Sequence, residues 1–225
     1  MKIEARFVRS AASAGDLPDD GLAEIALIGR SNVGKSSLIN ALVRQRLART
    51  SGAPGKTRLV NIYRVERGSA PPFYLVDLPG YGFARGGSDD LAAVARDYFP
   101  AHRSRRALAA LLLVDSRHPG LPSDIEAWRW LRTRVEGVDD IAIVATKIDK
   151  LARGERIRAM RELESVLDAP VLPASAATGE GLDELWKLIE RLANPNRRSS
   201  SPPPPPRDNP QAAAAAPAAR RPRRR

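Results

Sequence analysis

The chain has 225 residues, 43% of them hydrophobic and 28% charged, which is enough for one sizeable core plus extensions. Its net charge of +11 favours a polyanionic partner. The lack of cysteine excludes disulfides, thiol catalysis and cysteine-based zinc sites, and the lack of a long apolar run predicts a cytoplasmic protein without a membrane span or signal peptide.

The chain begins with a weak alternation of apolar residues, formed by Ile3, Ala5 and Phe7. This pattern predicts an N-terminal arm over residues 1–20 that is either an edge strand or extended chain. The apolar run at residues 24–28 then predicts the first buried strand of a domain that spans residues 21–194.

A phosphate-binding pattern, G-x-x-x-x-G-K-[ST], follows this strand and precedes a stretch with helical spacing. Strand, glycine-containing loop and helix form the context that a P-loop needs. The residues predicted to bind phosphate are Gly29, Arg30, Ser31, Asn32, Val33, Gly34, Lys35 and Ser36. Backbone N–H groups and the helix N-terminus would hold the phosphates, Lys35 would reach the outer ones, and the Ser36 hydroxyl would ligate Mg²⁺.

Residues 48–58 have no periodicity and many turn formers, which predicts a loop before the next strand. Thr57 immediately precedes that strand. We expect its hydroxyl to complete the Mg²⁺ sphere when a γ-phosphate is present, which would make the loop a switch. Thr50 and Ser51 are the alternative hydroxyls.

Two strands, at residues 59–65 and 73–77, are separated by a short turn, which predicts an antiparallel pair. The second ends in Asp77, Leu78, Pro79 and Gly80, the D-x-x-G pattern. An aspartate at this strand end can hold the Mg²⁺ shell, and the Gly80 N–H can sense the γ-phosphate.

Strands and helices alternate through the rest of the domain. Strands are predicted at residues 108–114, 141–145 and 171–172, and helices around residues 88–99, 125–135, 157–167 and 182–192. The third of these helices is expected to bury Ile157, Met160, Leu163 and Leu167. The order predicts an α/β sandwich with a mostly parallel six-stranded sheet, one antiparallel edge strand and helices on both faces, whose ligands bind at the carboxyl ends of the strands.

A base-recognition pattern follows the strand at 141–145, in Thr146, Lys147, Ile148 and Asp149. In the usual N-K-x-D motif the aspartate accepts two hydrogen bonds from guanine, a donor pair that adenine lacks. Here Thr146 replaces the asparagine whose amide ties this loop to the P-loop, so we expect that tie to be missing. The small residues Ser175, Ala176 and Ala177 follow the last strand and suit a loop whose backbone N–H meets the guanine O6.

From residue 195 the composition changes to proline, alanine and arginine, with eight arginines against one aspartate over residues 197–225. Such a segment cannot bury enough apolar surface to fold, which predicts a disordered tail over residues 195–225. The arginines indicate either a nonspecific polyanion contact or a solvated extension without a partner.

Together these motifs resemble the translational-type P-loop GTPases and, more narrowly, the EngB/YsxC/YihA family of bacterial ribosome-assembly GTPases. The resemblance rests on residues 29–40, 54–58, 77–83, 115–119 and 146–149, and it covers about residues 5–193. It implies a P-loop GTPase domain that binds GTP or GDP with Mg²⁺ and hydrolyses GTP slowly. It also implies association with the large ribosomal subunit and its rRNA, a switch role in the assembly of that subunit, and a need for the protein in normal cell division and septation.

The resemblance also implies further site residues. The expected nucleotide contacts extend to Gly55, Lys56, Thr57, Arg58 and Leu59, and the expected catalytic residues are Lys35, Thr57, Gly80 and Asn32.

Hydrolysis should be slow because Tyr81 directly follows D-x-x-G, where Ras-like GTPases carry the glutamine that orients the attacking water. Asn32 resembles the asparagine of potassium-activated relatives, which helps to hold K⁺ against the phosphates. Its alternative role is to stabilise the turn.

Two other functions fit parts of the chain. An ATPase or kinase would share the P-loop, but Asp149 argues against it. An rRNA-binding accessory protein in which nucleotide binding is only regulatory would explain the basic tail. We expect the protein to be a monomer, whichever of these functions it has.

Overall fold

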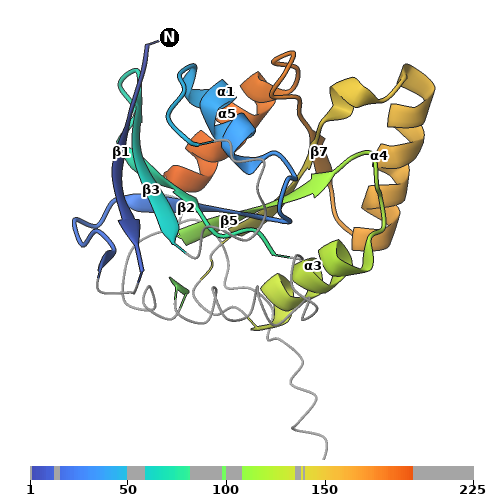
Figure 1. Cartoon of the computed structure of the whole chain (residues 1–225), viewed down its shortest axis with the longest axis horizontal. Coiled ribbons are helices and arrows are strands. Elements are labelled where there is room, and N and C mark those ends of the chain that lie inside the picture. Colours follow the sequence, from blue (N-terminus) through green and yellow to red (C-terminus); the bar gives the residue numbers. More distant parts are fainter. Residues whose placement is uncertain are drawn as a thin grey trace, which may run out of the picture. The chain divides into compact units, whose positions relative to one another are not determined.

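Seven strands form one sheet in the order β1-β3-β4-β2-β5-β6-β7 (Figure 1). The structure is a computed structural model that describes residues 2–12, 16–49, 59–81, 98–99, 108–134, 138 and 140–194. The chain divides into two units, Met1–Pro195 and Asn196–Arg225, and the fold is that of the first. Its strands are β1 (Ile3–Ala11), β2 (Ala23–Gly29), β3 (Val60–Arg67), β4 (Phe73–Asp77), β5 (Leu108–Asp115), β6 (Asp140–Thr146) and β7 (Val171–Pro173). The helices are α1 (Lys35–Val43), α3 (Pro122–Arg134), α4 (Arg153–Leu167), α5 (Leu182–Ala193) and the short 3₁₀ helix η3 (Ile148–Lys150).

The sheet confirms the predicted fold class and corrects two of its details. β2 runs parallel to β4 and β5, and β5, β6 and β7 are parallel to one another. β3 alone runs in the opposite direction, paired with β4 and with β1. The sheet therefore has seven strands rather than six, and its antiparallel strand lies one place in from the edge. The N-terminal alternation is weak because β1 is an edge strand with only Ala11 fully buried.

Helices cover both faces of the sheet, as predicted. α1 and α5 pack on one face against Ile25 and Leu27, and α3 and α4 share a core on the other face with Ile28 and Leu112 (Figure 1). β2 and β5 are buried at every position, which explains their unbroken apolar sequence. The successive residues Leu27 and Ile28 belong to different cores, as the period of a strand requires.

One helix prediction differs from the structure in a detail, and another falls almost entirely outside the described residues. Ile157 was expected on the buried face of α4, yet 46% of its surface is exposed. The helix instead buries Ala159, Leu163 and Leu167, spaced by four, because that stripe faces the sheet. The helix predicted at residues 88–99 lies outside the described residues apart from Tyr98 and Phe99, which are both buried.

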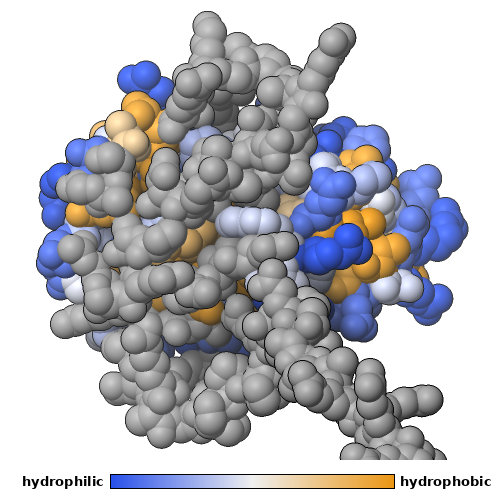
Figure 2. Space-filling view, turned by 90° about the horizontal axis from the view of Figure 1, so that it is seen from below, coloured by the Kyte–Doolittle hydropathy of each residue, from blue (hydrophilic) through white to orange (hydrophobic). Residues whose placement is uncertain are grey.

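The described surface is mixed in character. Hydrophobic residues occupy several separate areas of the face seen from below, with hydrophilic residues around them (Figure 2). Within the described residues, no helix has both the length and the apolar character to cross a membrane. The tail predicted at residues 195–225 lies outside the part of the chain that the structure describes.

Candidate nucleotide-binding site

The predicted motifs lie at one edge of the sheet. β2 ends at Gly29, β4 at Asp77, β6 at Thr146 and β7 at Pro173, and these strands run in the same direction. The carboxyl ends of parallel strands are where open α/β sheets bind ligands. The predicted loop residues Gly55, Lys56, Thr57 and Arg58 lie outside the described residues; Leu59 is described and exposed.

The P-loop has the backbone shape that phosphate binding needs. Gly29 is closely packed, since a Cβ there would lie 2.8 Å from Val33 Cγ1 and 2.9 Å from the Leu113 carbonyl oxygen. Gly34 has a φ of 111°, and it begins α1 without a side-chain cap. The first N–H groups of α1 consequently lack intrahelical acceptors and are available to an anion.

Lys35 and Asp77 are both buried, and their charges interact beside Ser36. Burial lowers the pKa of Lys35, which Asp77 opposes, and Lys35 Nζ donates to the Gly29 carbonyl oxygen at 3.2 Å. Burial raises the pKa of Asp77 to about 6, against the charge of Lys35 and a hydrogen bond from Ser36. The position of Asp77 at the strand end thus places an acid directly beside the helix that carries the predicted Mg²⁺ ligand.

These residues fit a hydrated divalent cation. The buried Asp77 Oδ1 has no hydrogen-bond partner in the described structure, so a water molecule of a Mg²⁺ shell would satisfy it. No group of three or more histidines or carboxylates gathers within the described residues. Mg²⁺ is usually held by few protein groups together with water and phosphate oxygens. Ser36 and the predicted Thr57 would supply the hydroxyl ligands.

The D-x-x-G segment packs directly on the P-loop. A Cβ at Gly80 would lie 2.8 Å from the Ser31 amide nitrogen, so only glycine fits this contact. Ser31 Oγ donates to the Gly80 carbonyl oxygen at 3.4 Å, and the Ser31 N–H donates to the Tyr81 carbonyl oxygen at 3.0 Å. The Leu78 side chain lies in the core, and Pro79 is half-buried.

The Thr146 hydroxyl overturns one expectation from the sequence. It lies 2.7 Å from the Val33 carbonyl oxygen of the P-loop and 3.1 Å from the Val114 carbonyl oxygen, and Thr146 is only 4% exposed. Lys147 Nζ adds a second link at 2.5 Å to the Asn32 carbonyl oxygen. The link between the Thr146–Asp149 loop and the P-loop is therefore present. The Thr146 hydroxyl at the end of β6 reaches the Val33 carbonyl directly, so the asparagine amide of the usual motif is not required.

Asp115 is a site residue that motif reasoning about the nucleotide did not assign. It ends β5 and accepts a hydrogen bond from Lys147 Nζ at 2.8 Å and a two-pronged pair from Arg117 at 2.8 and 3.0 Å. Burial would raise the pKa of Asp115, but these bonds hold it well below its usual value. In the sequence, Asp115 could have been noticed as a carboxylate that directly follows a buried strand, the position at which the other motifs also occur.

Asp149 is held by the buried hydroxyl of Ser175. Ser175 Oγ donates to Asp149 Oδ1 at 2.6 Å and accepts the N–H groups of Ala177 at 3.2 Å and Thr178 at 3.1 Å. The hydrogen bond from Ser175 lowers the pKa of Asp149. One serine thus orients both the carboxylate and the loop that contains Ala176 and Ala177. Ile148, between Lys147 and Asp149, is a core residue.

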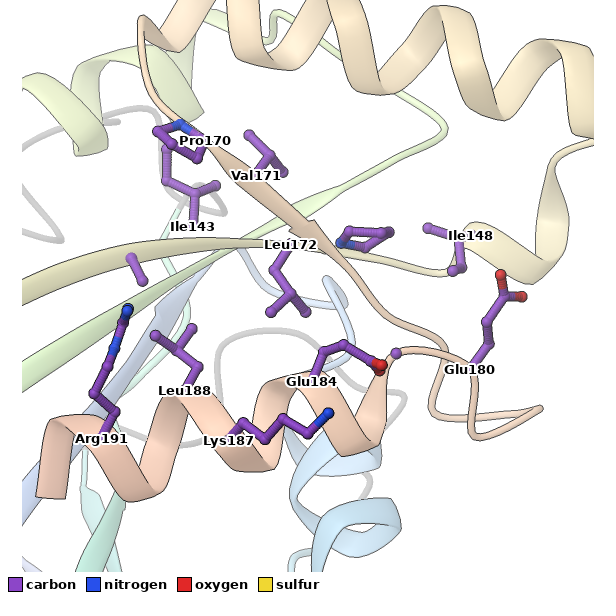
Figure 3. Close-up of a pocket in the computed structure, with 13 residues that line it drawn as sticks. Ile143, Ile148, Pro170, Val171, Leu172, Glu180, Glu184, Lys187, Leu188 and Arg191 are labelled. Carbon is purple, nitrogen blue, oxygen red and sulfur yellow. The ribbon is translucent and has the colours of Figure 1, made fainter.

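A separate apolar groove of about 810 Å³ lies between β7 and α5 (Figure 3). Leu172 and Leu188 face each other across it, and Glu184 and Lys187 line it from α5. Its lining includes neither a P-loop residue nor Asp149, so it is not the predicted nucleotide site.

The fold and these motifs define a P-loop GTPase domain. A family model described as 50S ribosome-binding GTPase matches residues 24–151. The probable GTP-binding protein EngB of Pelotomaculum thermopropionicum is 41% identical over 198 residues, which cover 85% of this chain and 96% of that protein. The one of Symbiobacterium thermophilum is 41% identical over 226 residues, covering 84% and 95%. The chain therefore belongs to the EngB family of GTP-binding proteins.

Solved structures agree on the fold. The crystal structure of a probable GTP-binding protein engB has a TM-score of 0.56 at 24% identity, over 76% of this chain and 98% of that one. Era in complex with MgGDPNP and nucleotides 1506–1542 of 16S ribosomal RNA has a TM-score of 0.60 at 20% identity, over 83% and 60%. At these identities the likeness concerns the fold alone.

The Thr146 contact makes a direct prediction. Thr146→Val keeps the shape of the side chain but leaves the Val33 carbonyl without its short hydrogen bond. We expect the affinity for GDP to fall roughly five- to tenfold, since an unpaired buried acceptor costs about 1 kcal/mol or more. Titration with a fluorescent GDP analogue measures the change. Thr146→Ser should restore binding, and Thr133→Val, which removes an exposed hydroxyl from α3, should leave it unchanged. Wild-type affinity in Thr146→Val would show that the hydroxyl does not support the site.

Proposed function

We propose that this protein binds GTP and GDP with Mg²⁺ and hydrolyses GTP slowly to GDP and phosphate. The observation that carries the proposal is the Asp149 carboxylate, which Ser175 holds at the same sheet edge as the P-loop. A fixed carboxylate accepts the N1–H and the amine of guanine, whereas adenine offers no such donor pair. Membership of a family of GTP-binding proteins supports the same conclusion.

Each part of the site then has a role in the reaction. The amides of the P-loop and the start of α1 bind the phosphates, and Lys35 places its charge at the outer ones. Ser36 and Thr57 would hold Mg²⁺, which would supply positive charge to the phosphates. Gly80 offers its N–H to the γ-phosphate from a peptide packed against Ser31. Lys35, Thr57, Gly80 and Asn32 are thus the proposed catalytic residues.

Guanine specificity is expected to depend on Asp149. Asp149→Asn replaces an acceptor by an amide that also donates, so GTP affinity should fall by about two to four orders of magnitude. Xanthosine triphosphate binding should improve, because that base carries a keto oxygen where guanine has its amine. Competition between the two nucleotides measures the switch. Asp183→Asn makes the same change at an exposed position of α5 and should alter neither affinity. Equal GTP binding by Asp149→Asn would remove the assignment.

Hydrolysis is expected to respond to potassium. We propose that turnover in sodium buffer lies below roughly 1 s⁻¹, and that K⁺ at equal ionic strength raises it through the side-chain oxygen of Asn32. Residue 32 has a φ of 63°, a conformation that glycine adopts without strain. Asn32→Gly therefore removes the side chain but keeps the turn, and it should abolish the gain from potassium. Equal rates in sodium and potassium would leave a macromolecular activator as the remaining explanation.

The proposed wider role is a nucleotide-dependent switch in assembly of the large ribosomal subunit. The protein would act in the cytoplasm and contact rRNA, and it would be needed for normal division and septation. The description of the family as a 50S ribosome-binding GTPase supports the partner, and the net charge of +11 supports a contact with rRNA. The arginine-rich sequence of residues 197–225 also favours the second candidate, an rRNA-binding accessory protein in which nucleotide only regulates binding.

Co-sedimentation with large ribosomal subunits distinguishes these functions. A switch should bind the subunits at least several-fold more tightly with a non-hydrolysable GTP analogue than with GDP, and binding should accelerate hydrolysis. A chain ending at Pro195, the boundary of the first unit, should keep the nucleotide dependence even if its overall affinity falls. Binding that depends on residues 196–225 and ignores the nucleotide would favour the accessory protein.

A further inference from the structure

Three side chains from separate parts of the chain meet beside the P-loop. Arg30 is the second residue of the P-loop, Tyr81 directly follows D-x-x-G, and Asp124 lies in the first turn of α3. The Tyr81 hydroxyl donates to Asp124 Oδ1 at 2.9 Å, and Arg30 Nε lies 3.2 Å from the same oxygen as an ion pair. One carboxylate oxygen therefore connects the two loops that approach the outer phosphates.

Two members of the cluster are almost completely shielded from water, whereas the Arg30 side chain is 26% exposed. Asp124 is 3% exposed and Tyr81 is 2% exposed. Burial raises the pKa of Asp124, while Arg30 and the Tyr81 hydrogen bond oppose the shift and Asp115 adds to it. A buried carboxylate is costly without partners, so loss of either partner would disturb the arrangement of the other.

The backbone of the two loops meets at the same place. Arg30 and Tyr81 form a parallel β-bridge, and the Ser31 N–H donates to the Tyr81 carbonyl oxygen at 3.0 Å. Gly80 then lies so close to Ser31 that no Cβ fits between them. The side-chain cluster and the backbone bond together fix the position of the peptide that links Gly80 to Tyr81.

We propose that Asp124 is a positioning residue of the nucleotide site: by holding Tyr81 and Arg30, it fixes the Gly80 N–H where the γ-phosphate is bound. The inference rests on the proposed function, because it concerns the same GTP site. Its consequence is selective. GDP lacks the phosphate that Gly80 meets, so Asp124 should contribute to binding of GTP and not of GDP.

Asp124→Asn tests the proposal in the full-length protein. The amide keeps the shape of the carboxylate but removes the charge that faces Arg30. We expect GDP affinity to stay within about twofold, and both the affinity for the non-hydrolysable analogue GDPNP and the single-turnover rate to fall about tenfold, because the ion pair with Arg30 is lost and the Tyr81 hydrogen bond is no longer made to a charged acceptor. Glu126→Gln makes the matching change at an exposed position of α3 and should alter none of these values.

Tyr81→Phe provides an independent variant should Asp124→Asn fail to fold. It removes only the hydroxyl, keeps the buried ring, and should lower GDPNP affinity about threefold with GDP affinity unchanged. A merely structural tie would instead lower the melting temperature and weaken GDP and GDPNP equally, which would overturn the proposal. An unchanged ratio of the two affinities, or a gain in GDPNP affinity, would also overturn it. Failure of the wild-type protein to bind GDPNP with Mg²⁺ would count against the proposed function itself.

Discussion

The site depends on the parallel pairing of β2 with β4 and β5, and of β5 with β6. This pairing brings the P-loop, Asp77, Asp115 and Thr146 to one edge of the sheet, although 117 residues separate Gly29 from Thr146 in sequence number. β2, β4 and β5 are buried throughout, so polar groups can be presented only where these strands end. β3 runs in the opposite direction, and its carboxyl end, Arg67, pairs with Glu190 of α5 instead.

Buried charge at this edge is balanced in pairs that join separate elements. Asp115 of β5 faces Lys147, and Asp124 of α3 faces Arg30 of the P-loop. Exchanging such pairs for apolar residues is often neutral or stabilising, so their contribution here is to geometry more than to stability. Asp77 differs from the other two carboxylates. The nearby Lys35 donates to the Gly29 carbonyl, and Asp77 Oδ1 has no hydrogen-bond partner within the described structure, which leaves capacity for a hydrated cation.

The sequence predicted the parts of the fold and site that are encoded in short contiguous stretches. Strands β4 and β5, the latter predicted one residue short at 108–114, the P-loop between β2 and α1, and the buried face of α5 could be recognised because their patterns are local. Strand β1 was ambiguous, since an edge strand is exposed on much of its surface and shows little alternation. Ile157 was wrongly predicted to be buried because a polar helix such as α4 offers more than one row of apolar residues at helical spacing. Packing against the rest of the fold determines which row is buried.

Contacts between distant segments could not be predicted from those patterns. The Thr146 hydroxyl reaches Val33 across 113 positions, and the spacing of a motif contains no information on whether a hydroxyl is close enough to replace an amide. Asp124 carried no motif at all, and its partners Arg30 and Tyr81 belong to two other stretches. Ser175 was predicted for its backbone, while its side chain is what orients Asp149. In each case the missing information was a distance between elements.

The direction of Tyr81 connects this geometry to the rate of the proposed reaction. Its phenol donates to Asp124 and is buried, so Tyr81 does not orient a water molecule as the glutamine of Ras-like proteins does. The same interaction fixes the Gly80 peptide against Ser31. On the proposed function, residue 81 would contribute to recognition of the γ-phosphate and not to activation of the nucleophile. Such a site would separate binding from catalysis. It would hold GTP in a defined state, and hydrolysis would be accelerated only when a cation or a partner supplies charge. On the proposed function, slow turnover would follow from the fold around Tyr81 and Asp124, and slow turnover is the property that a switch requires.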